Sequence, residues 1–268
     1  MTPIAVTIAG SDSGGGAGLQ GDLKTFSALG VYGASIVTAV TAQSTTGVSA
    51  IHDVPAEFVA AQIDAVFSDL HVDAVKIGML SQASVITAVA QGLERYRAQK
   101  VVLDPVMVAS TGEPLLAADA IEVLKRALLP RAMVLTPNLP EAAALLGAKV
   151  AQTQDEMHAQ ARALLGLGPQ AVVIKGGHAQ GETSIDLLVD QRGATALPAV
   201  RLASRNTHGT GCAFAAAIAA GLAKGLELTA AVRAAKAYVH AAIAAADTLE
   251  IGAGRGPIHH FHALWRRD

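Results

Sequence analysis

Short apolar runs alternate with longer segments of helical periodicity along almost the whole chain. Residues 4–9 (Ile-Ala-Val-Thr-Ile-Ala) form one such run, which is short and partly β-branched, as in a buried strand. Residues 17–29 follow it with apolar positions at the spacing of an amphipathic helix. Because this alternation continues without an internal repeat or a low-complexity linker, it predicts a single α/β domain over residues 1–268, with helices on both faces of one mostly parallel sheet.

The boundaries of the remaining elements follow from the same pattern and from turn residues. Further strands are predicted at 35–42, 48–54, 74–77, 101–103, 133–135 and 171–174, and a hairpin at 185–189 and 195–202. Helices are predicted at 57–70, 81–97, 119–129, 138–146, from 153 onward, and at 210–224 and 229–248. Asp119 is expected to cap its helix, and Thr153 with Glu156 has the spacing of a capping box.

Polar residues and glycines concentrate where the predicted strands end. They are Asp12, Gln43, Gly78, Asp104, Thr136, Asn138 and Lys175. In a parallel α/β sheet the ligand binds beyond the carboxyl ends of the strands. Packing alone does not account for an acid, an amide, a lysine and a glycine at several of these ends, so the pattern predicts a functional site there.

Individual members of this set also have purely structural interpretations. Asp104 precedes Pro105, and Asp-Pro sequences favour turns. Asn138 would serve equally well as a helix cap with Glu141 as its partner, or the two would face a site on one side of the helix. Lys175 is more specific, because a lysine at a strand end followed by two glycines is suited to hold phosphate.

A polar, glycine-rich stretch, residues 204–212, runs directly into an alanine-rich helix. The first backbone N–H groups of a helix have no partner inside it, and the helix dipole makes this end positive. The stretch therefore predicts an anion site. The alternative is an ordinary glycine turn before a buried helix, with Cys212 as a small core residue. The polar residues at the other strand ends favour the anion site.

The composition narrows the class of protein. Hydrophobic residues make up 51% of the chain and charged residues 16%, below the usual ~25%, so a large core is expected. The net charge of −2 and the aromatic content of 3% argue against nucleic-acid binding. The single cysteine excludes an internal disulfide, and we find neither a basic leader nor an apolar run of about 18 residues. We expect a cytoplasmic protein that binds neither nucleic acid nor a membrane.

Two motif-like strings are rejected on their context. Residues 16–21 match GxGxxG, but they open a helix well past the strand end and lack the acidic residue about 20 positions on, which argues against an NAD-binding oxidoreductase. His259, His260 and His262 lack acidic or cysteine companions, so we expect this tail to pack against the body rather than bind metal. The chain also contains no GxxxxGKS or GxxxxGKT phosphate loop.

Long motifs in a fixed order cover nearly the whole chain. They are residues 9–20 (AGSDSGGGAGLQ), 22–26 (DLKTF), 76–80 (KIGML), 103–107 (LDPVM), 136–142 (TPNLPEA), 175–178 (KGGH), 206–212 (NTHGTGC) and 256–261 (GPIHHF). Together they resemble the hydroxymethylpyrimidine/phosphomethylpyrimidine kinases of thiamine biosynthesis, in the ribokinase-like superfamily. Gly21 departs from that family, which usually carries Ala there. A glycine within a helix costs about 1 kcal/mol relative to Ala and changes no catalytic role.

The resemblance implies a three-layer α/β/α fold, a requirement for ATP and Mg²⁺, and a homodimer. It implies a small-molecule substrate, 4-amino-5-hydroxymethyl-2-methylpyrimidine, phosphorylated on its hydroxymethyl oxygen. A second transfer onto the monophosphate then gives the pyrophosphate. A pyridoxal kinase of the same branch, which also carries Cys at position 212, is the alternative enzyme. A non-catalytic nucleotide or pyrimidine sensor is the alternative from another class, although the set Lys175, Glu141 and Cys212 argues for catalysis.

We expect the phosphate end of the site to lie at the start of the helix at 210. The residues expected to hold the transferring phosphoryl group through their amides are Gly209, Thr210, Gly211 and Cys212. Lys175 would bridge ATP phosphate oxygens, with Asn138, Thr207 and Thr210 as further nucleotide contacts. Asp104 and Glu141 would order Mg²⁺ through water, which suits an ion that loses its water reluctantly. The helix at 229–245 would supply apolar atoms to the adenine.

The substrate end is expected to bind an aminopyrimidine ring. Gln43 donates and accepts with one amide, which matches the adjacent ring nitrogen and amine. Met79 and Val106 would form apolar walls, with Gly10 and Asp22 beside the substrate. The glycine-rich loop at 11–18 is expected to close over the site.

Cys212 is a candidate base for the substrate hydroxyl, because many ribokinase-like enzymes carry Asp at this position. A thiolate takes that role if its pKa is lowered. A helix N-terminus lowers the pKa of a thiol and nearby phosphates raise it, so the sequence leaves the net direction open.

Overall fold

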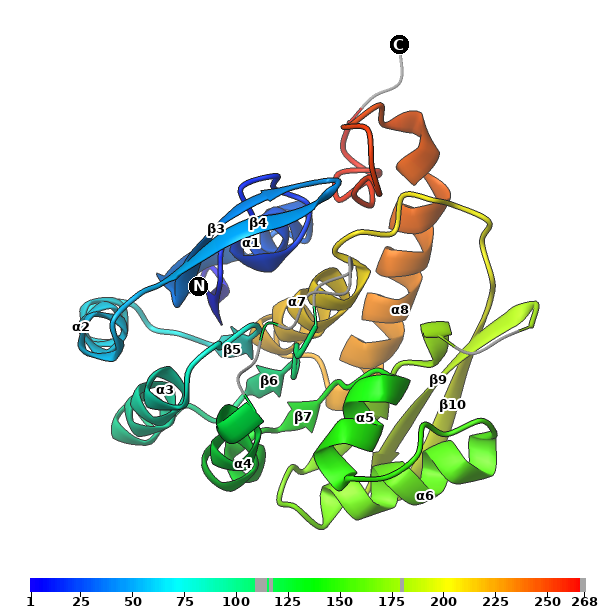
Figure 1. Ribbon diagram of the computed structural model, residues 1–268. Helices are drawn as coiled ribbons and strands as arrows, with labels where there is room; N and C mark the ends of the chain where they lie inside the picture. The colour runs from blue at the N-terminus through cyan, green and yellow to red at the C-terminus, as the bar shows by residue number, and fades with distance from the viewer. Residues whose placement is uncertain (109–114, 116–117, 179–180, 266–268) are drawn as a thin grey trace.

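The computed structural model describes residues 1–108, 115, 118–178 and 181–265, and the following account concerns these residues (Figure 1). The strands are β1 (Ile4–Ala9), β2 (Tyr32–Val37), β3 (Ala39–Ser44), β4 (Gly47–Asp53), β5 (Ala74–Ile77), β6 (Val101–Leu103), β7 (Val134–Leu135), β8 (Ala171–Ile174), β9 (Thr183–Asp190) and β10 (Gly193–Val200). The α-helices are α1 (Gly18–Ala28), α2 (Ala56–Phe67), α3 (Ala83–Arg95), α4 (Ala118–Ala127), α5 (Leu139–Leu146), α6 (Gln154–Leu165), α7 (Thr210–Ala223) and α8 (Leu228–Ala244). Short 3-10 turns follow at Leu129–Arg131, Gly176–His178 and Ala246–Thr248.

An eight-stranded sheet forms the centre, in the order β10-β9-β8-β7-β6-β5-β1-β2. Neighbours from β2 to β8 run parallel, while the β9–β10 hairpin adds two antiparallel pairings at one edge. The predicted hairpin and the mostly parallel sheet are therefore confirmed. Since β1, β5, β6, β7 and β8 run the same way, the residues that follow them all lie at one edge of the sheet.

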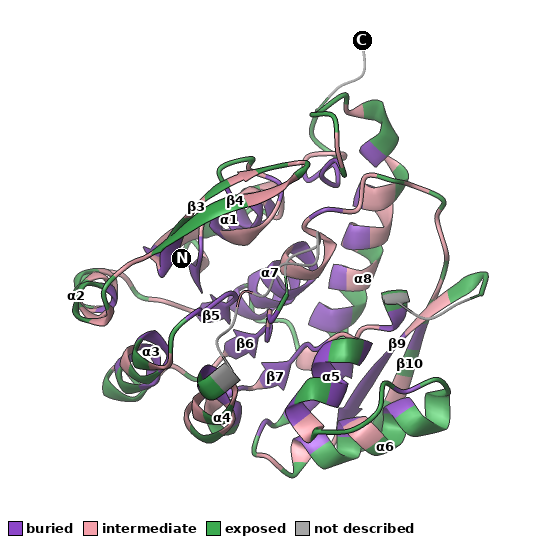
Figure 2. Ribbon diagram, in the orientation of Figure 1, coloured by how far each residue is buried: buried purple, intermediate pink, exposed green. Residues whose placement is uncertain are grey.

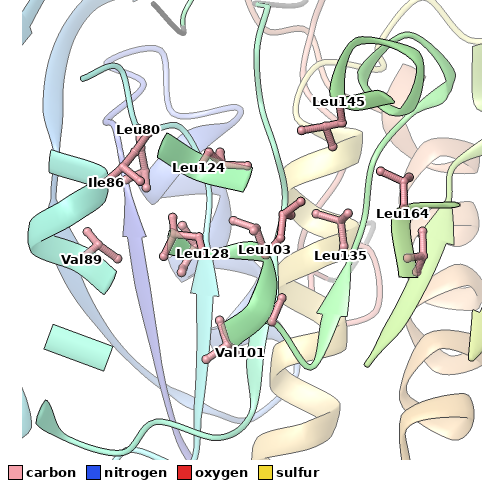
Figure 3. Close-up of a cluster of buried hydrophobic side chains, with 14 of the residues drawn as sticks. Leu80, Ile86, Val89, Val101, Leu103, Leu124, Leu128, Leu135, Leu145 and Leu164 are labelled. Carbon is pink, nitrogen blue, oxygen red and sulfur yellow. The ribbon is translucent and has the colours of Figure 1, made fainter. Parts of the chain in front are cut away.

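Helices cover both faces of this sheet, so the three-layer prediction is confirmed (Figure 1). Side chains on one face pack with α2 to α6, and those on the other face pack with α1, α7 and α8. The central strands β1, β5, β6, β7 and β8 and helix α7 are the most continuously buried elements (Figure 2). Figure 3 shows the first of these layers, where Leu103 and Leu135 of the sheet meet Leu124 and Leu128 from the α4 region.

One predicted strand is divided in two. Instead of a single strand at 35–42, β2 ends at Val37 and the chain leaves the large sheet to form a two-stranded sheet, β3–β4. Thr38 marks the division: its hydroxyl donates to the carbonyl of Met79 at 2.9 Å, and its own N–H donates to the carbonyl of Ala9 at 3.0 Å. The extra strand expected at 48–54 is confirmed as β4.

Helix starts follow the sequence signals in two of three cases. Asn138–Glu141 and Thr153–Glu156 both form reciprocal capping boxes, at α5 and α6. Asp119 does not cap α4, because the helix begins at Ala118 and places Asp119 inside its first turn. A carboxylate there still interacts favourably with the positive end of the helix.

The C-terminal tail packs against the body as expected. His259 and His260 are buried, and the His259 N–H donates to the carbonyl of Ala242 in α8 at 3.0 Å. The described residues contain no group of three or more His, Cys, Asp or Glu side chains placed to hold a metal ion. No helix in the described part of the chain is long and apolar enough to cross a membrane.

Candidate active site

A cavity of about 830 Å³ opens at the carboxyl ends of the parallel strands. Every predicted site residue except Asp22 lines it: Gly10, Gln43, Met79, Asp104, Val106, Asn138, Glu141, Lys175, Thr207, Gly209, Thr210, Gly211 and Cys212. These residues come from strand ends, from the β3–β4 hairpin and from the start of α7. The sheet topology therefore assembles in one place residues that are up to 202 positions apart, as Gly10 and Cys212 are.

The helix that faces this cavity begins without a side-chain cap. Gly209 is the residue before α7 and has a φ of +81°, so the next residues present their amides at the cavity wall. Thr210 fixes the turn, because its hydroxyl donates to the carbonyl of Thr207 at 2.7 Å. The first-turn N–H groups of a helix are unpaired within it, which makes this end of α7 suitable for an anion.

Gly209→Ala is expected to lower the free energy of unfolding by about 3 kcal/mol, the sum of a left-handed alanine and a steric overlap. A Cβ at Gly209 would overlap the carbonyl oxygen of Gly16, so the two glycine-rich segments touch backbone to backbone. Urea denaturation measures the change. The matched control is Gly225→Ala, where φ is +84° but no atom lies within 4 Å of the added carbon. Equal losses in the two variants would contradict the assigned close approach.

Lys175 lies between two carboxylates. Its Nζ is 2.6 Å from Oδ1 of Asp104 and 3.8 Å from Oε2 of Glu141. The Thr136 hydroxyl also donates to Asp104 Oδ1, at 3.0 Å. Burial opposes the charge on Lys175, but Asp104 and Glu141 outweigh it and raise the lysine pKa, so the ammonium is retained. Burial raises the pKa of Glu141 to about 7, against the opposite effect of Lys175.

Asn138 and Glu141 serve as a cap and also line the cavity. The Asn138 side chain accepts the Glu141 N–H at 2.8 Å, and Glu141 accepts the Asn138 N–H at 2.7 Å. The structural interpretation is therefore confirmed, and it does not exclude the functional one, because both side chains border the cavity. The capping box holds the Glu141 carboxylate beside Lys175.

The other end of the cavity is formed by small and apolar groups around one amide. The backbone of Gln43 is held by Ser13, whose Oγ accepts the Gln43 N–H and donates to its carbonyl, both at 2.8 Å. Gly10 has no side chain where Met79 lies, since a Cβ there would be 3.0 Å from the Met79 methyl carbon. Val106 completes the apolar lining.

Asp22 is not where the sequence placed it. Its carboxylate is completely buried between α1 and the sheet, 2.7 Å from the Lys76 ammonium and 2.6 Å from the Thr7 hydroxyl. It lies on the inner side of α1 and does not line the cavity. Helical spacing alone did not distinguish a residue facing the site from one facing the sheet.

Cys212 lines the cavity and is partly exposed. Burial raises the pKa of its thiol to about 11, and Lys76 pulls in the opposite direction. The net shift is thus opposite to the lowering that the helix terminus alone would give. The thiol is protonated at neutral pH in the absence of ligands.

A buried carboxylate–imidazole contact ties the two glycine-rich segments together, and the sequence did not reveal it. Asp12 Oδ2 lies 2.8 Å from Nε2 of His208, and the same carboxylate accepts N–H groups from Gly14, Gly16 and Ala17. Burial alone would raise the Asp12 pKa, but the bonds from His208 and the loop amides lower it. The partners are 196 residues apart, so no local pattern joins them.

Helix α8 supplies side chains to the cavity. The sequence analysis expected this of the helix but did not name the residues. Val239 and Ile243 add apolar lining, and Lys236 pairs with Asp186 of β9 at 2.7 Å. A second carboxylate–lysine pair thus lies at the hairpin side of the cavity.

This arrangement suits phosphoryl transfer, because positive charge and helix amides meet in one cavity. With its three-layer α/β/α fold, the protein is a kinase of the ribokinase-like class. The model of the phosphomethylpyrimidine kinase family matches residues 12–259, and the chain belongs to this family.

Individual relatives agree with this assignment. The chain is 60% identical to the hydroxymethylpyrimidine/phosphomethylpyrimidine kinase of Rhizobium meliloti, over 99% of this chain and 100% of that protein. It is 51% identical to a thiamine biosynthesis bifunctional protein of Geobacter sulfurreducens, over 96% of this chain and 52% of that protein. It superposes on an ADP complex of Bacillus subtilis pyridoxal kinase with a TM-score of 0.91 and 36% identity, over 99% of this chain and 100% of that structure.

Proposed function

We propose that the protein transfers the terminal phosphoryl group of ATP to the hydroxymethyl oxygen of 4-amino-5-hydroxymethyl-2-methylpyrimidine, and then phosphorylates the monophosphate to the pyrophosphate, as a step in thiamine biosynthesis. The observation that carries this proposal is the cavity at the carboxyl ends of the strands. It joins a site for phosphates, formed by Lys175 and the start of α7, to a small amide-bearing site around Gln43.

The residues of the phosphate end act by charge and position. The Lys175 ammonium would lie against phosphate oxygens and would exchange its bond with Asp104 for them. The amides of Gly211 and Cys212 would bind the oxygens of the phosphoryl group during transfer. The substrate oxygen attacks phosphorus, the bond to ADP breaks, and the hydroxyl proton passes to the sulfur of Cys212 in its thiolate form.

The donor set also fits Mg²⁺. Asp104 and Glu141 provide two carboxylates on either side of Lys175, and Mg²⁺ typically takes one or two carboxylates, phosphate oxygens and water. When bound, the ion would neutralise charge on the phosphates. Lys175 would have to move off the carboxylates for both to be used, since its Nζ is 2.6 Å from Asp104.

A substrate panel tests the function. ADP release is measured with hydroxymethylpyrimidine, its monophosphate and pyridoxal under identical conditions. Turnover of both pyrimidines is expected. Turnover of pyridoxal alone would favour the second candidate, for which the TM-score of 0.91 to a pyridoxal kinase is the specific reason. Binding without ADP release from any of them would indicate a sensor.

Gln43→Ala is expected to raise the KM for the pyrimidine by about 10- to 100-fold, the value of one or two hydrogen bonds to a buried ligand, and to leave the KM for ATP unchanged. Steady-state kinetics with each substrate varied in turn measures the two constants. Gln152→Ala is the control, because Gln152 lies on the surface and does not line the cavity. An equal rise in both KM values would contradict a role confined to the pyrimidine ring.

We also propose that the protein is a homodimer that associates through the β3–β4 sheet. Val40 and Ile51 of this sheet are 44% and 40% exposed, and Phe58 of the following helix is 61% exposed. Val40 pairs with His52 and Ile51 with Thr41, so the two apolar side chains lie on opposite faces of the small sheet, and exposed apolar side chains of this kind favour association. Sedimentation of the wild type and of Val40→Lys would compare their molar masses.

A further inference from the structure

A small polar cluster lies inside the apolar layer between the sheet and helices α1 and α7. Ala5 and Ala74 face this layer, so Thr7 and Lys76, two positions along the same strands, face it too. Asp22 reaches the cluster from α1. Lys76 and Asp22 are both fully buried, and their 2.7 Å bond joins a strand to a helix. Burying an ion pair in such a layer contributes little to stability, because the loss of hydration offsets the attraction between the charges.

This cluster adjoins elements that line the cavity. Helix α7 packs against β1 and β5, the strands that carry Thr7 and Lys76. A Cβ at Gly78 would be 2.6 Å from the Lys76 ammonium, and the next residue, Met79, lines the cavity. Cys212 lies in the first turn of α7. Its sulfur therefore belongs to the helix layer, and the Lys76 ammonium belongs to the sheet against which α7 packs.

The charges of the cluster are incompletely matched. Oδ2 of Asp22 accepts bonds from Lys76 and Thr7, but its buried Oδ1 has no hydrogen-bond partner. Burial raises the pKa of Asp22 to about 6 in spite of the lysine. Four charged groups act on Cys212. Lys76 and Lys175 attract its thiolate, while Asp22 and Asp104 repel it.

We propose that Lys76 is a positioning residue for Cys212, whose thiolate it stabilises from the adjoining buried cluster, and that Asp22 competes with the thiolate for this buried positive charge. The proposal rests on the proposed role of Cys212 as the base. A purely structural role for the pair, as a tie between α1 and the sheet, makes no prediction about the thiol.

The two charges have opposite effects on the thiol, and this difference forms the test. Cys212 is the only cysteine in the chain, so the rate of alkylation by iodoacetamide reports on it alone. Asp22→Asn frees the Lys76 charge while its amide oxygen still accepts the bonds from Lys76 and Thr7. Alkylation at pH 8 is expected to become about tenfold faster, which corresponds to a thiol pKa lowered by about one unit.

Asp22→Asn with Lys76→Met removes both buried charges together and leaves neither unpaired. This double variant is expected to react about tenfold more slowly than Asp22→Asn, and more slowly than the wild type. Asp64→Asn is the matched control, because Asp64 forms an exposed pair with Arg95 on the surface. It is expected to leave the alkylation rate unchanged.

Thermal unfolding establishes which variants fold. If the double variant is unfolded, the alkylation rates of Asp22→Asn and the wild type are compared. If Asp22→Asn is unfolded, the rates of the double variant and the wild type are compared. A slower or unchanged rate in Asp22→Asn, or equal rates in the single and double variants, overturns the proposal. The assay contains no substrate, so its outcome is independent of whether the pyrimidine is phosphorylated and distinguishes this inference from the proposed function.

Discussion

Lys175→Met is expected to lower kcat by about 10²- to 10³-fold, the usual loss when one preorganised group that stabilises transition-state charge is removed. Lys175 lies close to the start of α7, since a Cβ at Gly211 would lie 3.3 Å from its Nζ. The terminal phosphate would therefore lie within its reach. Steady-state ADP release with saturating pyrimidine and ATP measures the change.

The control for this variant removes a lysine outside the cavity. Lys125→Met acts on α4, where Lys125 pairs with Glu122 at 2.9 Å, and should leave kcat unchanged. Lys175→Met also leaves the Asp104 and Glu141 carboxylates without their shared cation, so its melting temperature is recorded in parallel. A folded variant with nearly normal kcat would show that phosphate charge is neutralised elsewhere.

Cys212→Ala is expected to lower kcat by about 10²- to 10⁴-fold, the range for a general base, with ATP binding retained. In the wild type the thiol has a pKa of about 11, so at pH values below 11 its ionised fraction rises about tenfold for each unit by which the pH increases. Hence kcat/KM should rise with pH between 7 and 9, and this slope should vanish in the variant. Calorimetric titration with ATP measures the binding.

Cys212→Ser is the useful companion, because it keeps a group of similar shape that cannot ionise in this range. It should behave like the alanine variant. Near-normal turnover in either variant, or a pH slope that persists without the sulfur, would show that Cys212 only fills space at the start of α7.

The main features of the fold could be predicted because each depends on a local signal. β1 is a continuous apolar run, and the capping boxes at Asn138 and Thr153 occupy three-residue spacings. The break between β2 and β3 could not be predicted in this way. It depends on bonds from Thr38 to Ala9 and Met79, and the run of small and β-branched residues continues unchanged through it.

The site was predicted in so far as strand order collects polar residues at one edge. Lys175 and Asp104 could be grouped because each ends a parallel strand. The Asp12–His208 pair could not, since its two members come from loops whose contact depends on tertiary packing. The prediction that Asp22 lies beside the substrate was wrong for a related reason. The periodicity of α1 locates the apolar side of the helix but does not show which polar residue is buried on that side.

The separate two-stranded sheet has a consequence for how far substitutions in one part of the protein disturb the other. Gln43 belongs to β3, whereas Lys175, Asp104 and Cys212 are fixed by the large sheet and α7. With the roles proposed above for these residues, substitutions in the β3–β4 hairpin would alter ring recognition without displacing the large sheet and α7. The proposed ring-binding amide and the proposed phosphate-binding groups are thus carried by two separate sheets, so one can be substituted while the backbone that holds the other keeps its hydrogen bonds.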